Sequence, residues 1–207
     1  MGKTVVSAAL VHRYRHLAVR YWKPIQTGIE RDDDSADVQR LSACAVSNVL
    51  NAGIRLPVPV SPHLAARLDG STIELDALLA IAAAQPRHAR WIVEGAGGIL
   101  VPLNERDLLV DLVRRLELPT LVVARSGLGT INHTLLTLEA LARRDIVVAG
   151  VVMVGAPNPD NRLAIEHYGR TRVLGELPVL ALLDGVALGA WADRALDVDG
   201  SLEECFA

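Results

Sequence analysis

The first residues of the chain, Gly2-Lys3-Thr4, are of types that could bind phosphate. They match the end of the pattern G-x-x-x-x-G-K-[ST]. There, backbone N–H groups surround the phosphates, the lysine reaches the terminal phosphates and the hydroxyl binds Mg²⁺. Only Met1 precedes Gly2, so the first half of the pattern is not in the sequence. A helix start with an incidental lysine would look the same, and the rest of the chain has to decide.

Lysine is rare in this chain: of its 21 basic residues, only Lys3 and Lys23 are lysine. Lysine carries a compact point charge, whereas arginine is a flat, wide fork. A sequence that otherwise uses arginine should retain lysine where a tight phosphate or carboxylate pocket excludes the fork. We therefore interpret Lys3 and Lys23 as residues of such a pocket.

Two acids complement this cationic pair. Glu94 ends the apolar run "WIV" and is followed by Gly-Ala-Gly-Gly, where it could bind Mg²⁺ or position water. The alternative is a surface turn with a spare glutamate. Asp34 stands at the start of a helical pattern, where acids are favoured by capping and by the helix dipole alone. Together with Gly-Lys-Thr and Glu94, it becomes a candidate second metal ligand.

Apolar runs and helical patterns alternate along the chain. Continuous apolar runs, typical of strands buried on both faces of a parallel sheet, cover residues 17–24, 53–60, 90–98, 118–127, 145–155 and 172–178. Helical patterns cover residues 3–14, 34–45, 73–84, 107–116, 130–143 and 161–168. We expect one three-layer α/β domain over residues 1–207, with a mostly parallel central sheet flanked by helices. The chemically suggestive stretches follow predicted strands, where such sheets bind ligands.

A further anion site could lie where "SGLGTINHT" leads into a helix. A substrate carboxylate or phosphate could bind at residues 130–132, although Thr130 could equally be a plain helix cap.

Composition excludes other classes of function. The net charge of −3 gives no reason to expect nucleic-acid or anionic-membrane binding. No apolar run reaches about 20 residues. The two cysteines lack metal-type spacing, and we expect a cytoplasmic protein.

Taken together, these stretches resemble dethiobiotin synthetases. The matching pieces are "GKTVVSAAL", "WKPIQTG", "DDDSADVQRL", "VSPHLAA", "VEGAGGILVPL", "LPTLVVARSGLGTINHTLLTLEAL", "AGVVMVGAPNPDNRLAIE" and "LGELPVL". The resemblance implies a P-loop NTPase fold and a homodimer with active sites at its interface. It also implies a cyclo-ligase of biotin biosynthesis. CO₂ joins 7,8-diaminononanoate as a carbamate, ATP phosphorylates the carbamate, and the second amine closes the cyclic urea and releases phosphate.

The resemblance also assigns roles to individual residues. Lys3 and Lys23 match catalytic lysines, and the metal ligands for Mg²⁺ are Thr4, Asp34 and Glu94. Thr27 and Asn132 match residues that bind the substrate. Residues that match contacts to ATP are Gly2, Lys3, Thr4, Val5, Asp34, Glu94, Gly95, Ala96, Gly97, Val154, Gly155, Pro178, Val179 and Leu180.

The sequence departs from the family in two places. A strand and a loop of the form Gly-Thr-x-Thr-x-x precede Gly-Lys-Thr in the family. We therefore expect the natural chain to begin upstream, with Met1 a GUG valine codon taken as a start. The second departure is in the base pocket, where Val154 and Gly155 replace an asparagine that contacts adenine in the family. ATP remains the expected nucleotide, but strict selectivity for adenine is not expected.

Other functions remain open on the residues alone. A cobyrinic-acid amidating synthetase shares the fold but needs a glutamine-hydrolysing domain for which 207 residues leave no room. A partitioning ATPase would carry a further lysine near the start of its loop, with a basic face or amphipathic tail. The position of that lysine is not in this sequence, and the acidic net charge and the ending "SLEECFA" argue against a basic face and an amphipathic tail. An inactive or truncated paralogue of the same fold, acting as a scaffold, is the third alternative.

Overall fold

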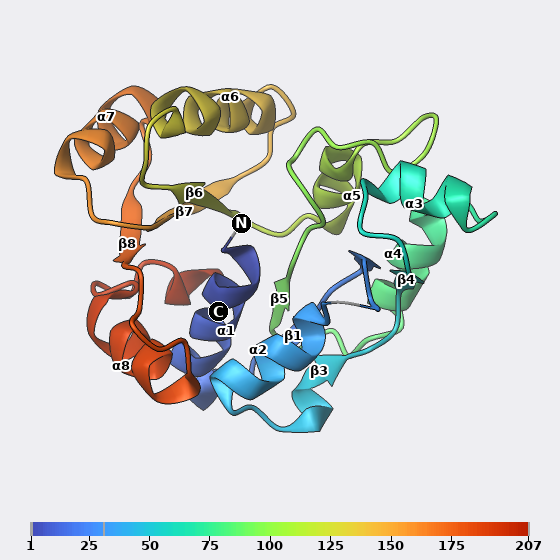
Figure 1. Cartoon of the computed structure of the whole chain (residues 1–207), viewed down its shortest axis with the longest axis horizontal. Coiled ribbons are helices and arrows are strands. Elements are labelled where there is room, and N and C mark those ends of the chain that lie inside the picture. Colours follow the sequence, from blue (N-terminus) through green and yellow to red (C-terminus); the bar gives the residue numbers. More distant parts are fainter. Residues whose placement is uncertain (1, 31, 207) are drawn as a thin grey trace.

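The computed structural model describes residues 2–30 and 32–206, and the expectation about Met1 lies outside them. Figure 1 labels its elements. The strands are β1 (Arg20–Trp22), β2 (Ile25–Thr27), β3 (Val49–Leu50), β4 (Ile54–Leu56), β5 (Trp91–Val93), β6 (Thr120–Arg125), β7 (Val148–Val154) and β8 (Val173–Leu177). The α-helices are α1 (Lys3–Arg13), α2 (Asp34–Ser42), α3 (Pro62–Leu68), α4 (Leu75–Ala83), α5 (Leu109–Leu116), α6 (Thr130–Ala142), α7 (Pro159–Gly169) and α8 (Gly185–Ala195). Short 3₁₀ helices are η1 (Arg15–Leu17), η2 (Val46–Asn48) and η3 (Glu203–Phe206).

Parallel strands flanked by helices confirm the predicted α/β class. Every pair of strands in the described residues is parallel, in the orders β3-β1-β5, β2-β4 and β6-β7-β8. Within the described residues the parallel strands form three groups, and β5 and β6 are edge strands of separate sheets. The strand predicted within residues 17–24 is β1, which ends before Pro24 as expected. Pro24 has no N–H to donate, and the chain pairs with β4 only beyond it, through β2.

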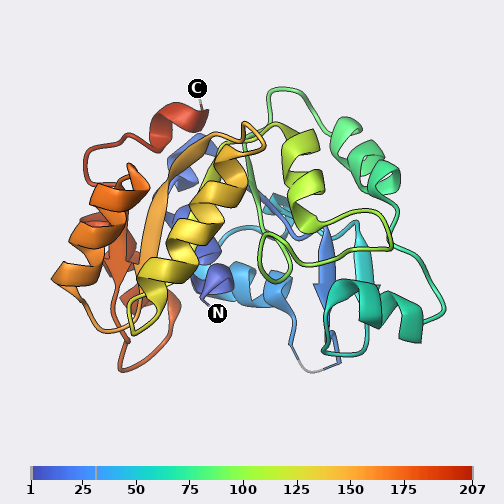
Figure 2. The same cartoon turned by 90° about the horizontal axis from the view of Figure 1, so that it is seen from above.

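The helices lie on both sides of the strands. Figures 1 and 2 show α6 and α7 along one face of the β6–β8 sheet, and α1 near the centre of the molecule. The largest cluster of buried apolar side chains joins α1 to α2 and α8, with Leu10 and Tyr14 packed beside Leu41 and Trp191. A second cluster lies between α3, α4, α5 and the β2–β4 pair, and a third between α6, α7 and the β6–β8 sheet. The central helix α1 therefore has a fixed position, and with it the residues that begin it.

Capping residues set where several helices begin. The Asp33 carboxylate accepts hydrogen bonds from the N–H groups of Ser35 and Ala36, at 3.0 and 3.1 Å, so α2 starts at Asp34. Asn158 caps α7 in the same way, and Asp184 caps α8. Helix α1 begins after Gly2, which has a φ of +93°. That left-handed conformation favours glycine, so the turn into α1 depends on the residue type at position 2.

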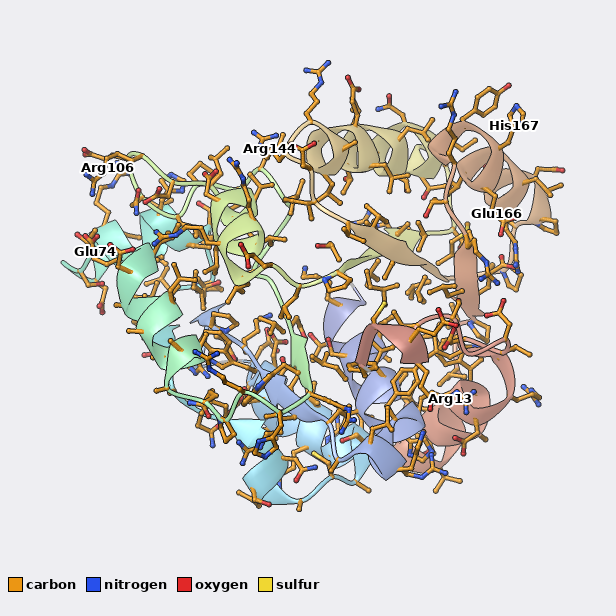
Figure 3. The ribbon with its side chains drawn as sticks, turned by 180° about the vertical axis from the view of Figure 1, so that it is seen from behind. Arg13, Glu74, Arg106, Arg144, Glu166 and His167 are labelled. Atoms are coloured by element: carbon orange, nitrogen blue, oxygen red, sulfur yellow. The ribbon has the colours of Figure 1, made fainter. Side chains whose placement is uncertain are left out.

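Charged side chains cover the outside of the molecule. Figure 3 shows Arg106, Arg144 and His167 at its periphery. None of the helices in residues 2–30 and 32–206 combines the length and apolar character needed to cross a membrane.

Candidate active site

Four predicted site residues meet in one hydrogen-bonded cluster. The ammonium group of Lys23 lies 2.6 Å from Oδ2 of Asp34 and 2.7 Å from Oε1 of Glu94. The hydroxyl of Thr4 is 2.7 Å from Oδ1 of Asp34 and 3.1 Å from Oε1 of Glu94. Lys23 and Glu94 are buried, whereas the side chain of Asp34 is 27% exposed. Residues 4, 23, 34 and 94, far apart in the chain, therefore form one polar centre.

The elements explain why these four side chains converge. Strands β1 and β5 are paired in parallel, with Trp22 opposite Val93. The residues that follow, Lys23 and Glu94, therefore leave neighbouring strands side by side at the carboxyl edge of the sheet. Thr4 stands in the first turn of α1 and Asp34 in the first turn of α2, and these two helices pack together. Two strand ends and two helix starts thus define the site.

Tyr21 completes the support of Glu94, and sequence reasoning missed it. Its hydroxyl donates a hydrogen bond of 2.9 Å to Oε2 of Glu94, and its side chain is fully buried. Both carboxylate oxygens of Glu94 are therefore held, Oε1 by Lys23 and Thr4 and Oε2 by Tyr21. Tyr21 lies two positions before Lys23, on the same face of the strand, and that spacing was the available signal.

Burial and charge act in opposite directions on the ionisable groups of the site. Burial raises the pKa of Asp34, but the charge of Lys23 and hydrogen bonds from Lys23 and Thr4 outweigh it, and the pKa is lowered overall. Burial, followed by the nearby charge of Lys23, lowers the pKa of Lys3. Burial and the charge of Glu94 raise the pKa of Tyr21 above its ordinary value, so this phenol remains a donor.

The cluster offers oxygen ligands of the kind that Mg²⁺ prefers. One hydroxyl and two carboxylates converge, from Thr4, Asp34 and Glu94. Over residues 2–30 and 32–206, no group of three or more histidine, cysteine, aspartate or glutamate side chains has the arrangement of a metal site. A protein-only metal cage is thus not formed, which is usual for Mg²⁺ because it keeps several waters and binds substrate phosphates as well.

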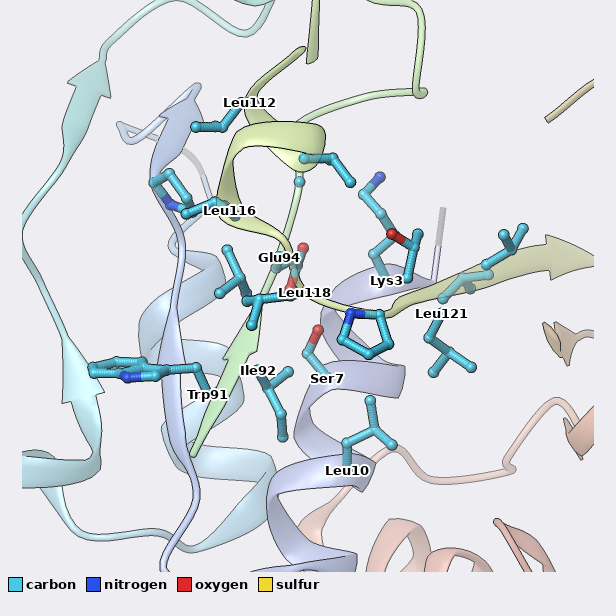
Figure 4. A pocket seen from close by; sticks show the side chains of 18 of the residues that line it. Lys3, Ser7, Leu10, Trp91, Ile92, Glu94, Leu112, Leu116, Leu118 and Leu121 are labelled. Atoms are coloured by element: carbon cyan, nitrogen blue, oxygen red, sulfur yellow. The ribbon is translucent and has the colours of Figure 1, made fainter. Parts of the chain in front are cut away.

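The glycine-rich turn after Glu94 borders the same region. Residues 94–98 and Lys3 line a common cavity, which Figure 4 shows from close by. A Cβ at Gly95 would lie 3.0 Å from Leu109, and Gly97 has a φ of +80° next to Val101. Gly95 and Gly97 therefore have little room for larger residues, whereas a Cβ at Gly98 would meet nothing within 4 Å. This is consistent with the predicted close approach of a ligand to the backbone there.

The other predicted nucleotide contacts lie at the carboxyl edge of the β6–β8 sheet. Val154 ends β7 and lies against Gly2, where an added Cβ would be 3.2 Å from its methyl groups. The N–H of Gly155 donates to the carbonyl of Leu177 at 2.9 Å. Pro178 and Leu180 are half-buried beyond β8, while Val179 is 81% exposed. Through Gly2 and Val154, this edge adjoins the start of α1.

The remaining predicted residues do not join the hydrogen-bonded cluster. Thr27 is half-buried at the end of β2, and Asn132 is exposed in the first turn of α6. Val5 packs against the largest apolar cluster with part of its surface exposed. The roles assigned to these three residues stay predictions. Thr130 is the first residue of α6, and the N-cap is Gly129, so the alternative of Thr130 as the helix cap is not confirmed. The Thr130 hydroxyl donates to the carbonyl of Arg125.

Comparison with known proteins finds a family model and several relatives that match most of this chain. A family model described as an AAA domain matches residues 1–187. The ATP-dependent dethiobiotin synthetase of Paramagnetospirillum magneticum is 51% identical over 180 residues, which cover 87% of this chain and 83% of that protein. The enzyme of the same name from Brucella ovis is 47% identical, with coverage of 87% and 82%. The biotin biosynthesis bifunctional protein of Bordetella avium is 43% identical over 98% of this chain and 42% of its own length.

The parallel strands, the Gly-Lys-Thr start of α1 and the match to the AAA-domain model define a P-loop nucleotide-binding protein of the AAA-domain type. With half of its aligned residues identical over most of both chains, the protein belongs to the family of ATP-dependent dethiobiotin synthetases.

Proposed function

We propose that this protein carries out the ATP-dependent carboxylation and ring closure of 7,8-diaminononanoate to dethiobiotin, a step of biotin biosynthesis. The observation that carries the proposal is the cluster of Thr4, Lys23, Asp34 and Glu94 in a chain 51% identical to a dethiobiotin synthetase. The substrates would be the diamine, CO₂ or bicarbonate, and ATP.

The proposed reaction balances in three steps. One amine attacks CO₂ and loses a proton, which gives a carbamate. An oxygen of the carbamate then attacks the γ-phosphorus of ATP, and ADP leaves. The second amine attacks the carbonyl carbon of the mixed anhydride, the bond to the phosphate oxygen breaks, and the ring closes with loss of a proton. The oxygen that bridged carbon and phosphorus leaves with the phosphate.

Two lysines suit the second step because it brings two anions together. The carbamate and the γ-phosphate repel each other, and positive charge fixed between them lowers the barrier. Lys23 has a fixed position through its contacts with Asp34 and Glu94, at 2.6 and 2.7 Å. Lys3 is close enough for the charge of Lys23 to lower its pKa. Both can thus act on the same transferring group.

A magnesium ion fits the donor set of Thr4, Asp34 and Glu94, and these residues would hold it. When bound, Mg²⁺ supplies positive charge to the phosphate oxygens. The nucleotide would contact Gly2–Val5, Gly95–Gly97, Val154, Gly155 and Pro178–Leu180, all at carboxyl ends of strands or at the start of α1. Thr27 and Asn132 would bind the diamine substrate, with Asn132 at its carboxylate tail.

A homodimer with active sites at its interface is part of the proposal. Large apolar side chains are exposed beside the proposed substrate residue Asn132: Leu128 is fully exposed and Leu136 is 55% exposed. Exposed apolar side chains of this size next to a site are typical of protein contacts.

We also propose a cytoplasmic location, which agrees with the free thiols of Cys44 and Cys205.

The experiment that tests this function measures dethiobiotin by mass spectrometry. The chain of 207 residues, and the same chain extended by its in-frame upstream codons, would each receive diaminononanoate, bicarbonate, Mg²⁺ and ATP. We expect ATP-dependent product from at least one form, and roughly 100-fold less or lower from its Lys23→Met variant. Absence of product from both forms, with the proteins folded, would overturn the proposed function.

A further inference from the structure

Arg55, in the middle of β4, lies opposite Gln26 of β2 in the register of these two parallel strands. Figure 2 shows the two strands side by side. Successive side chains of a strand point to opposite faces of a sheet, and residues that are paired in register share a face. The side chains of Arg55 and Gln26 therefore leave the same face of the β2–β4 pair. Neither side chain takes part in the proposed reaction steps.

The guanidinium group of Arg55 holds the backbone of Lys23. Its Nη1 donates a hydrogen bond of 2.9 Å to the carbonyl oxygen of Lys23. That carbonyl lies where the chain changes partners, because the bonds from β1 to β5 end at the carbonyl of Trp22 and those from β2 to β4 begin at the carbonyl of Pro24. Arg55 thus supplies a donor to the carbonyl group that lies between the two strand pairings.

Gln26 makes a corresponding contact with the segment that leads into α2. Its Nε2 donates a hydrogen bond of 2.8 Å to the carbonyl oxygen of Asp32, and the residue is buried. Asp33, the next residue, caps α2, and Asp34 is the first residue of that helix. One face of the β2–β4 pair therefore contacts the chain at Lys23 and close to Asp34, the two residues that form the 2.6 Å ion pair of the site.

Arg55 contacts backbone carbonyls instead of a carboxylate. Within residues 2–30 and 32–206 it takes part in none of the ion pairs, and its Nη2 is buried without a hydrogen-bond partner. Burial lowers the pKa of Arg55, and the charges of Asp33 and Asp34 act against this shift, so its charge lies near the start of α2. A buried donor without a partner lowers stability. A role in the site explains why an arginine stands here in spite of that loss.

We propose that Arg55 is a positioning residue of the candidate active site, which acts through the backbone of Lys23. By holding that carbonyl, it sets the point from which the side chain of Lys23 reaches Asp34 and Glu94, at 2.6 and 2.7 Å. A displacement of about 1 Å in a reacting group can slow a reaction by about 100-fold. The catalytic consequence rests on the proposed function, whereas the effect of Arg55 on the Lys23 ammonium group does not.

The first measurement compares Arg55→Met with a matched arginine variant. Arg55→Met keeps an apolar stem and removes the guanidinium group, and it should lower kcat by roughly tenfold or more with little change in KM for the diamine. Arg13→Met is the control. Arg13 is also half-buried and donates to two backbone carbonyls, those of Leu196 and Asp197 at 3.1 and 3.2 Å, at the opposite end of α1 from the site. Its replacement should lower stability and preserve kcat.

The second measurement needs no catalysis. Because Lys3 and Lys23 are the only lysines of the 207 residues, the chain labelled with nitrogen-15 lysine gives two side-chain ammonium signals in NMR spectra, and Lys3→Met assigns the remaining one to Lys23. In Arg55→Met, hydrogen exchange of the Lys23 ammonium group should be roughly tenfold faster, because its contacts with the two acids open more often. Arg13→Met should leave this exchange unchanged.

Two results would overturn the proposal: unchanged exchange of the Lys23 ammonium group in Arg55→Met, or equal losses of kcat in Arg55→Met and Arg13→Met. If Arg55→Met does not fold, Arg55→Lys replaces it. Lysine keeps the charge but lacks the planar fork, so exchange at Lys23 should still rise by roughly threefold or more, and no rise would contradict the positioning role. If no form of the chain makes dethiobiotin, the proposed function fails, and ammonium exchange still decides the role of Arg55.

Discussion

The ammonium group of Lys23 lies 2.7 Å from Oε1 of Glu94, with both side chains buried at the ends of paired strands. The same ammonium group also lies 2.6 Å from Oδ2 of Asp34, which belongs to helix α2. One lysine therefore holds two carboxylates that would otherwise repel each other. This relationship fixes the relative positions of the three charged side chains in the candidate site.

Replacement of Lys23 by methionine should impair both folding and activity. Loss of one partner from a buried ion pair costs about 3–5 kcal/mol, and the partial exposure of Asp34 favours the lower end, about 3 kcal/mol. Loss of charge at the transferring phosphate should reduce kcat by roughly 100-fold or more. Urea unfolding and the dethiobiotin assay measure the two effects. Lys23→Arg should not restore activity, because the planar guanidinium group of arginine cannot replace a compact ammonium group that contacts two carboxylates. Full activity of either variant would contradict this role.

Tyr21→Phe should reduce kcat by roughly tenfold and leave KM for the diamine nearly unchanged. The reason is that Oε2 of Glu94 loses its 2.9 Å hydrogen bond and the carboxylate is no longer held at both oxygens. Tyr14→Phe is the matched control. This variant removes a buried 2.6 Å hydrogen bond from Tyr14 to Asp197. Tyr14 caps the carboxyl end of α1, whereas Thr4 stands at the opposite end of that helix. The Tyr14 variant should lower stability by about 1–3 kcal/mol and preserve kcat. Equal kcat losses in the two variants would show that Tyr21 has only a structural role.

Asn132→Ala should raise KM for diaminononanoate by roughly tenfold with little change in kcat, because a group that binds the substrate tail contributes equally before and during the reaction. The neighbouring His133 is also exposed, in the same turn of α6, and His133→Ala provides the control. Steady-state kinetics of both variants decide the matter. An unchanged KM in Asn132→Ala would remove this residue from the substrate site.

Asp193 should make part of the stability dependent on pH. A hydrogen bond from Arg15, at 2.9 Å, and a contact with His12, at 3.2 Å, keep the pKa of Asp193 below its ordinary value. Its contribution is therefore present above the unfolded pKa of about 3.9 and is lost as pH falls through the folded value. Asp193→Asn should cost up to about 1 kcal/mol at pH 6, since the pair is partly exposed, and almost nothing at pH 2. Urea titrations at both values test this, and an equal cost at each would contradict it.

The sequence predicted the elements better than their pairing. The predicted helix over residues 3–14 corresponds to α1, and the run 145–155 contains β7, because hydrophobic periodicity is a local property. Helix α3 and the two-residue β3 were not predicted as such. The division of the sheet between β5 and β6 could not be predicted from spacing either, because register and edges depend on contacts between distant segments.

The candidate site shows the same contrast. The scarcity of lysine indicated Lys23, and an apolar run placed Glu94 at a strand end. Because parallel strands end at one edge of a sheet, the contact between these two residues could be predicted. The hydrogen bond from Tyr21 to Glu94 could not, since it depends on the register of β1 against β5. The members of the cluster could thus be predicted by residue type, whereas the residue that supports Glu94 required the structure.

The most direct test of the central claim follows one oxygen atom. The active form is mixed with diaminononanoate, ATP and Mg²⁺ in ordinary water, and bicarbonate labelled with oxygen-18 is added just before a short reaction. If a carbamate oxygen attacks the γ-phosphate, the released phosphate gains label in step with the dethiobiotin formed. Dethiobiotin accompanied by unlabelled phosphate, or phosphate released at the same rate without the diamine, would contradict the account.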